Sequence, residues 1–287
     1  MKISLDCFPC FLRQALEASR ISGADENEQK KVLNSIMSTL LTVPPDITPP
    51  QIGWLIHSTI REITGNPDPY KKIKSFHNDQ VLGIKADLDK LIHESPEPFV
   101  DALSLAGTGN LIDMGPERQW TDIQDIFRRF SSKNSAFFDH PSFEQSLKES
   151  RTLLYIGDNA GEIVLDKILI TLFIKETNVD ITYAVRGKPI INDATMEDAQ
   201  FVGITDIVRV IDTGGDFPGV VLDSCSEEFL DYYHNVDIIL AKGQGNYESL
   251  SDESKNIFFL LKAKCPVIAD KIGCKVGDLV LKKGTSE

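Results

Sequence analysis

The spacing of apolar residues divides the chain into a helical first part and an alternating second part. Up to about residue 100, apolar residues recur every three or four positions, which predicts amphipathic helices over 10–20, 26–41, 51–64 and 70–93. Proline-containing breaks at 43–50 and 66–70 separate the last three, because proline lacks the N–H donor that a helix interior requires. We therefore expect a helical cap domain over residues 1–100.

From Arg151 onward, short apolar segments alternate with segments of helical spacing. Strands are predicted over 152–156, 181–186, 207–212, 236–241 and 265–269. Such repeated alternation predicts an α/β fold with a Rossmann-like, doubly wound and mostly parallel sheet. We expect this α/β domain to cover residues 101–287, with 101–150 as a helical connection.

Polar residues and glycines follow the predicted strands, at the sheet edge where open α/β proteins bind their ligands. They are Asp158, Asn159, Arg186, Asn192, Asp193, Lys242, Gly243, Gly245 and Asn246. Taken alone, Asp158 and Asn159 would more often form a turn or a helix cap, and the glycines around Gln244 match no complete phosphate-loop motif. Their coincidence at one predicted edge nevertheless favours a site.

The residue types at this edge restrict the chemistry. Asp158, Asn159 and Asp193 offer hard oxygen ligands, which suit Mg²⁺ or Mn²⁺. Lys242 and the glycine amides that follow it would form a cationic pocket, rich in donors, for a phosphate group. A metal beside such a pocket indicates phosphoryl chemistry, so the α/β domain is predicted to bind both metal and phosphate.

Charge and cysteine content restrict the partners and the compartment. The chain of 287 residues has 43 acidic and 30 basic side chains and a formal net charge of -13, so neither nucleic acid nor a membrane is an expected partner. The N-terminal segment lacks the apolar core of a signal peptide, and the 5 cysteines are an odd number for a disulfide framework. These features predict a cytoplasmic protein.

Cys7 and Cys10 stand three positions apart near a predicted helix start. The pair fits a structural role as buried thiols, half of a metal site with Cys265 or Cys274 as a distant partner, or a redox pair. The sequence leaves all three open.

Several of these blocks carry a family resemblance. "YIGDNAGEIVLDK", "RGKPIINDAT", "DTGGDFPGVVLDSCSEEF", "AKGQGNYESL" and the upstream "ALSLAGTGNLID" resemble the metal-dependent damage-control phosphatase family, long known as domain of unknown function 89. The early "CFPC" resembles its archaeal and bacterial subgroup with paired N-terminal cysteines. The resemblance covers most of the chain. It implies a helical part packed on a Rossmann-like part, and hydrolysis of phosphate monoesters with Mn²⁺, Ni²⁺, Co²⁺ or Mg²⁺.

The resemblance also implies roles for individual residues. Asp158, Asn159 and Asp193 would be the metal ligands, and Asp158, Asp193 and Lys242 the catalytic residues. The residues expected to bind or position the substrate are Asn110, Asp113, Glu162, Arg186, Asn192, Gly243, Gly245 and Asn246. From spacing alone, Asn110 and Asp113 would more often mark a turn or a helix start.

Together the residues and the resemblance predict a divalent-metal-dependent phosphatase. Its substrate would be a small phosphorylated metabolite, such as a sugar phosphate or a damaged phosphometabolite, hydrolysed by metal-activated water or through a covalent aspartyl-phosphate on Asp158. One alternative is an S-adenosylmethionine-dependent carboxyl methyltransferase, because Gly214 and Gly215 follow a strand of a Rossmann-like sheet. The other is a non-catalytic sugar-phosphate-binding protein.

Overall fold

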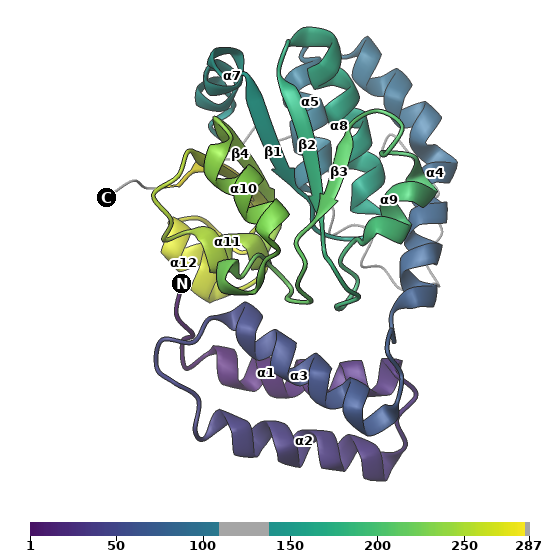
Figure 1. Ribbon diagram of the computed structural model, residues 1–287, viewed down its shortest axis with the longest axis vertical. Coiled ribbons are helices and arrows are strands. Elements are labelled where there is room, and N and C mark those ends of the chain that lie inside the picture. The colour runs from purple at the N-terminus through teal and green to yellow at the C-terminus, as the bar shows by residue number, and fades with distance from the viewer. Residues whose placement is uncertain (109–137, 285–287) are drawn as a thin grey trace.

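A computed structural model describes residues 1–108 and 138–284 of the chain (Figure 1). Its centre is a six-stranded sheet with the order β3-β2-β1-β4-β5-β6, in which β6 (Leu279–Lys283) runs antiparallel to its neighbour β5. The parallel strands are β1 (Thr152–Ile156), β2 (Asp180–Val185), β3 (Arg209–Asp212), β4 (Ile238–Lys242) and β5 (Ile257–Lys262). The order reverses between β1 and β4, as in Rossmann-like sheets, which confirms the predicted fold class.

Helices cover both faces of the sheet, because successive side chains of a strand point to opposite faces. Leu153 and Tyr155 of β1 share a core with α4 (Lys71–Glu94), α5 (Pro98–Gly107), α7 (His140–Glu149), α8 (Glu162–Glu176) and α9 (Met196–Val202). Leu154 and Ile156 share a second core with α10 (Glu227–Asn235), α11 (Gln244–Leu250) and α12 (Pro266–Ile272). A short 3₁₀ helix, η2 (Leu222–Ser224), precedes α10.

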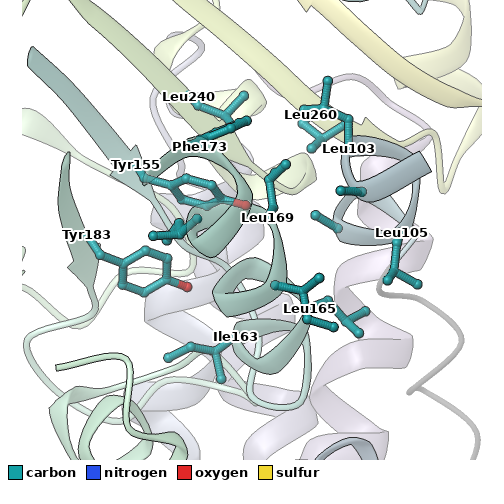
Figure 2. Packing of buried hydrophobic residues seen from close by; sticks show 14 of the residues in the cluster. Leu103, Leu105, Tyr155, Ile163, Leu165, Leu169, Phe173, Tyr183, Leu240 and Leu260 are labelled. Atoms are coloured by element: carbon teal, nitrogen blue, oxygen red, sulfur yellow. The ribbon is translucent and has the colours of Figure 1, made fainter. Parts of the chain in front are cut away.

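The larger core is centred on α8, which lies against the sheet (Figure 2). Leu169 and Phe173 of this helix pack near Tyr155 and Leu240, and Leu260 joins them from β5. All five side chains are fully buried, and burying one side chain of this size contributes about 1.5–3 kcal/mol. The α8 helix is apolar around most of its surface, as expected for a helix that is covered on several sides.

The first three helices form a core of their own. They are α1 (Cys7–Ile21), α2 (Glu26–Leu40) and α3 (Pro49–Thr64), and their shared core includes Phe11, Val32, Ile36 and Ile56. Figure 1 shows this bundle at the end of the sheet towards which the parallel strands point. The α4 helix packs instead against α8, so it belongs to the layers around the sheet. The domain boundary near residue 100 stays a prediction.

The bundle is docked onto the sheet edge through α3. Trp54 donates its indole N–H to Asp216 Oδ1 at 2.7 Å and stacks on Phe217 with ring centroids 5.4 Å apart. Arg61 donates to Asp216 Oδ2 at 2.5 Å and to the backbone oxygen of Pro189 at 2.9 Å. Helix α3 is therefore held over the loops that follow β2 and β3.

The predicted strand over 265–269 is wrong. Cys265 is the N-cap of α12 and Pro266 is its first residue, a position where the missing N–H of proline costs no helical hydrogen bond. The fifth parallel strand lies earlier, in the apolar run of β5, which is buried on both faces. Asp270 and Lys271 therefore lie within a helix, and the loop at the strand end begins at Ala263. The other four predicted strands are confirmed, with small differences in their bounds.

In the two described ranges, every helix is too short or too polar to cross a lipid bilayer. The predicted cytoplasmic location is not tested by this observation.

Candidate active site

Two loops at the carboxyl edge of the sheet are tied together by their backbones. The loop after β1 carries Asp158 and Asn159, and the loop after β2 carries Asp193. Ala194 donates its N–H to the backbone oxygen of Asp158 at 2.8 Å, and Asn159 and Asp193 form an isolated antiparallel bridge. Because β1 and β2 are neighbours, the three predicted metal ligands are brought together.

The interpretation of Asp158 and Asn159 as helix caps is wrong. The α8 helix begins at Glu162, its N-cap is Gly161 with φ 81, and no side chain caps it. The N–H of Gly161 donates instead to Asn78 Oδ1 at 2.6 Å. The side chains of Asp158 and Asn159 are therefore available to a site.

Asp158 lies among other carboxylates. It is half-buried, and its Oδ2 accepts a hydrogen bond from Asn159 Nδ2 at 3.0 Å; the same Nδ2 donates to Glu162 Oε1 at 2.9 Å. Desolvation raises the pKa of Asp158 well above its usual range, and the negative charges of Glu162 and Asp193 raise it further. A cation bound beside Asp158 would relieve this repulsion.

Arg186 pairs with Asp193 and keeps one nitrogen without a hydrogen-bond acceptor. Its Nε donates to Asp193 Oδ2 at 2.7 Å and its Nη2 to Asn246 Oδ1 at 3.1 Å, while the side chain is only 1% exposed. Burial raises the pKa of Asp193, and the charge of Arg186 opposes that shift. The third nitrogen, Nη1, is buried without a hydrogen-bond partner, which is unfavourable unless a ligand supplies an acceptor.

Lys242 pairs with two carboxylates of α8. Its Nζ is 2.7 Å from Asp166 Oδ1 and 3.3 Å from Glu162 Oε2, and the side chain is 1% exposed. Burial alone would lower the pKa of Lys242, but the two carboxylates raise it, so the amine stays charged. Tyr155 and Tyr183 donate their hydroxyls to Asp166 at 2.7 and 2.8 Å. The predicted contact between Lys242 and phosphate is not tested, and within this network the lysine pairs with protein carboxylates.

The two glycines after β4 allow close approach of neighbouring groups. Gly243 has φ 83, and a Cβ there would lie 2.0 Å from Asp158 Oδ2. A Cβ on Gly245 would lie 2.2 Å from the backbone oxygen of Pro218. The N–H of Gly243 donates to the Leu260 oxygen at 3.0 Å, so this amide is used within the sheet and does not face a phosphate.

Asn246 holds several loops together. Its Nδ2 donates to the backbone oxygens of Lys242 and Gly157 at 2.7 and 3.2 Å, and its Oδ1 accepts from Val220 N and Arg186 Nη2 at 3.0 and 3.1 Å. The side chain is completely buried. Because its donors and acceptor are used by the protein, Asn246 acts by positioning Arg186 and the loop backbones.

The remaining predicted substrate-binding residues are less informative. Asn110 and Asp113 lie outside the described residues. Asn192 is half-buried, and its backbone oxygen accepts from the N–H of Ala160 at 2.8 Å, which strengthens the pairing of the two loops.

Two polar residues of α4 support the site, and neither was predicted from the sequence. Asn78 accepts from Gly161 N and donates to Asp198 Oδ1 at 2.9 Å, and Lys74 Nζ lies 2.9 Å from Asp198 Oδ2. Both side chains are buried. Their spacing from Val81 puts them on the apolar face of α4. Polar residues on an otherwise apolar helix face are the sequence signal that could have predicted a role for Lys74 and Asn78.

Lys264 was missed because the fifth strand was misplaced. It is exposed in the loop after β5, and its backbone N–H donates to Gln244 Oε1 at 3.0 Å. Desolvation raises the pKa of Asp158 and of Asp193, and the positive charge of Lys264 opposes the shift at both. The ammonium group therefore lies within electrostatic reach of both carboxylates.

The donor set fits a hard divalent ion. Within residues 1–108 and 138–284, no group of three His, Cys, Asp or Glu side chains is arranged to hold a metal alone. Asp158 and Asp193 supply two carboxylates, and Asn159, whose Nδ2 bonds Asp158 and Glu162, supplies an amide oxygen. Mg²⁺ is commonly bound by one or two carboxylates, with water and substrate phosphate completing its shell. The composition and the negative charge of the cluster agree with such a site.

Fold and site together define an α/β protein with a Rossmann-like sheet, a helical bundle over the carboxyl edge and a carboxylate-rich site at that edge. Residues 3–280 match the damage-control phosphatase ARMT1-like domain, and the chain belongs to this family. The family resemblance of the sequence is thereby confirmed. Assignment to the subgroup with paired N-terminal cysteines stays a prediction.

Archaeal relatives match over nearly the whole chain. An uncharacterized protein of Methanocaldococcus jannaschii is 36% identical and covers 99% of this chain and 96% of its own length. A damage-control phosphatase of Archaeoglobus fulgidus is 32% identical and covers 98% of this chain and 99% of its own length. The crystal structure of a family protein from Pyrococcus horikoshii superposes with a TM-score of 0.92 at 30% identity, covering 99% of this chain and 100% of that one.

Proposed function

We propose that the chain is a divalent-metal-dependent phosphatase that hydrolyses phosphate monoesters of small metabolites. Family membership supports phosphatase chemistry. The observation on this chain that carries the proposal is the convergence of Asp158, Glu162 and Asp193. Desolvation raises the pKa of Asp158, and the negative charges of Glu162 and Asp193 raise it further. A divalent cation is the ligand that best fits such a cluster.

Asp158, Asn159 and Asp193 would hold the ion, which we propose to be Mn²⁺, Ni²⁺, Co²⁺ or Mg²⁺. When bound, such an ion polarises a phosphoryl oxygen and lowers the pKa of a coordinated water. Asn159 is oriented for this role because its Nδ2 is held by Asp158 and Glu162, which leaves Oδ1 to serve as the ligand.

The cationic side chains have separate roles. Arg186 holds Asp193 in place and offers Nη1 as a donor to a phosphoryl oxygen. Lys264 brings a second positive charge from the exposed side of the site. Lys242 acts through Glu162: it pairs with that buried carboxylate, and Glu162 in turn holds the amide of Asn159.

We propose a small phosphorylated metabolite as substrate, either a sugar phosphate or a damaged phosphometabolite, and the cytoplasm as the location. Helix α3, docked over the loops after β2 and β3, supports a small substrate because a large one would compete with this contact. The net charge of -13 disfavours nucleic acid and anionic membranes as partners. Water is the proposed nucleophile, with Asp158 as the alternative.

Metal removal tests the proposed function. Protein treated with a chelator and then dialysed is expected to release phosphate from p-nitrophenyl phosphate about 10²-fold more slowly than the same protein resupplied with Mn²⁺, because the ion supplies the Lewis acid. A panel of sugar phosphates assayed with each of the four ions would then define the substrate class.

Three outcomes would contradict the phosphatase proposal. Full activity in excess chelator would remove the metal from the mechanism. Binding of a sugar phosphate without phosphate release under any ion would favour the non-catalytic alternative. Thermal stabilisation by S-adenosylmethionine, with none by Mn²⁺, would favour a methyltransferase, although Gly214 is packed against Ser226 and leaves little room for such a cofactor.

Lys264→Gln is expected to lower kcat/KM about tenfold to a hundredfold, because it removes a positive charge beside developing phosphoryl charge. Its thermal midpoint should change little, because interactions of an exposed charged side chain contribute only about 0–1 kcal/mol. Lys275→Gln, which makes the same change of charge at an exposed position in the loop after α12, is the matched control. Equal kcat/KM in the two variants would exclude Lys264 from the site.

A further inference from the structure

Three cysteines from distant parts of the sequence lie at the starts of two helices, α1 and α12. Cys7 and Cys10 lie in the first turns of α1, and Cys265 is the N-cap of α12. Figure 1 shows α1 beginning below α11 and α12. The α-amino group of Met1 donates to the backbone oxygen of Glu248, which fixes the N-terminal segment against α11.

Gln244 connects this group of thiols to the site. Its Nε2 lies 3.8 Å from Cys265 Sγ and donates to Glu248 Oε1 at 2.8 Å, while its Oε1 accepts from Lys264 N at 3.0 Å. Gln244 directly follows Gly243, the glycine that packs against Asp158. Cys265 is therefore connected through Gln244 to the loops that carry Lys264 and Gly243.

The three sulfur atoms lie close enough to influence one another. Desolvation raises the pKa of Cys7 and of Cys10, and the charge of an ionised Cys265 raises both further. A hydrogen bond from Ser4 N to Cys7 Sγ, at 3.4 Å, opposes the shift at Cys7, and Arg13 opposes it at Cys10. Because their pKa values are raised, Cys7 and Cys10 are poorly ionised at neutral pH, which suits slow exchange and not a rapid oxidoreductase.

The helix start can accommodate a disulfide between Cys7 and Cys10. Side chains three positions apart on a helix have Cβ atoms about 5–6 Å apart, and a disulfide needs about 3.5–4.5 Å. Only a small adjustment of the first turn of α1 is required, and Pro9, between them, has no N–H to lose. Cys10 is exposed and Cys7 is half-buried, so an oxidant in solution reaches Cys10 first.

We propose that Cys7, Cys10 and Cys265 form a thiol–disulfide exchange site whose oxidant is a low-molecular-weight disulfide. The Cys10 thiolate attacks one sulfur of that disulfide, which breaks its S–S bond, forms a mixed disulfide and releases one small thiol. Cys7 then attacks Cys10 Sγ and releases the second small thiol. Two cysteines are oxidised, and their two electrons and two protons leave with the two small thiols.

Cys265 connects the thiol–disulfide exchange site to the loop after β5, at the active-site edge. As a third thiolate it attacks Cys10 Sγ, which expels Cys7 as a thiol and moves the disulfide to Cys10–Cys265 with no further oxidant. This bond would link α1 to the loop after β5, next to Lys264.

Disulfide mapping tests this exchange site. A double variant, Cys225→Ser with Cys274→Ser, keeps only the thiols of Cys7, Cys10 and Cys265. It is incubated with glutathione disulfide and reduced glutathione at fixed ratios. The protein is then alkylated, digested and analysed by mass spectrometry. We expect a Cys7–Cys10 linked peptide, a lesser Cys10–Cys265 species, and the loss of both after treatment with dithiothreitol. Adding Cys10→Ser should abolish both, and adding Cys265→Ser should leave Cys7–Cys10 alone.

Other outcomes would overturn the exchange site. They are stable glutathione adducts without a protein disulfide, three free thiols in excess oxidant, or zinc that copurifies with the protein and is released only when the thiols are blocked. Circular dichroism of each variant confirms that it is folded. None of these readouts depends on phosphatase activity, so the exchange site and the proposed function can fail separately.

Discussion

Replacing Asp158 with Asn is expected to lower metal-dependent phosphate release about 10³-fold while leaving the metal-free protein at least as stable as the original. Desolvation and the charges of Glu162 and Asp193 raise the pKa of Asp158. A carboxyl group whose pKa is higher in the folded than in the unfolded state lowers stability at neutral pH, and a neutral amide removes that effect. The measurements are kcat/KM with Mn²⁺ and urea unfolding in chelator.

Asp193→Asn is the matched comparison, because it makes the same change at a neighbouring ligand position. Here the carboxylate pairs with Arg186 at 2.7 Å, so the substitution leaves a buried guanidinium without its ionic partner. We therefore expect this variant to lose both activity and stability. Full activity in Asp158→Asn, or a marked loss of stability in its metal-free form, would contradict the placement of Asp158 as a metal ligand in a repulsive cluster.

Lys242→Met is expected to lower the free energy of unfolding by about 3–5 kcal/mol, the usual cost of removing one partner from a buried ion pair. Lys242 is 1% exposed and pairs with Asp166 and Glu162, so its loss leaves two carboxylates without their cation. Activity should fall as well, because Glu162 holds Asn159. Urea unfolding, followed by circular dichroism, gives the change in stability.

A second substitution separates the buried network from a direct phosphate contact. Asp166→Asn added to Lys242→Met removes one of the unpaired charges, so the double variant should recover part of the lost stability. If Lys242→Met instead kept its full stability and lost only turnover, Lys242 would act on the substrate and not through the network.

The carboxyl-edge rule accounts for most of what the sequence predicted correctly. Asp158 and Asp193 follow two strands that the chain places side by side, and parallel strands bring their carboxyl ends to one edge. The rule failed at residues 265–269, where an apolar segment beginning Cys-Pro is a helix start. That error also hid Lys264, because the true strand end lies just before it.

The direction of each side chain could not be predicted from the sequence. Lys242 ends β4, and only the packing of α8 on that face of the sheet brings its amine to Asp166 and Glu162, which are four residues apart on one helix face. Asn246 was predicted to bind substrate because it follows a strand end, but its amide is used by four protein groups. Polar residues at a strand end therefore predict which residues come together better than what each side chain contacts.

Binding of Mn²⁺ to the metal-free protein, followed by the electron paramagnetic resonance signal of the free ion, tests the metal site most directly. We expect one ion per chain in the original protein and a dissociation constant raised at least about 10–100-fold in Asp158→Asn and in Asp193→Asn. Lys275→Gln should bind as the original does. Equal affinity for Mn²⁺ in the original protein and in both aspartate variants would contradict a metal site built from Asp158, Asn159 and Asp193.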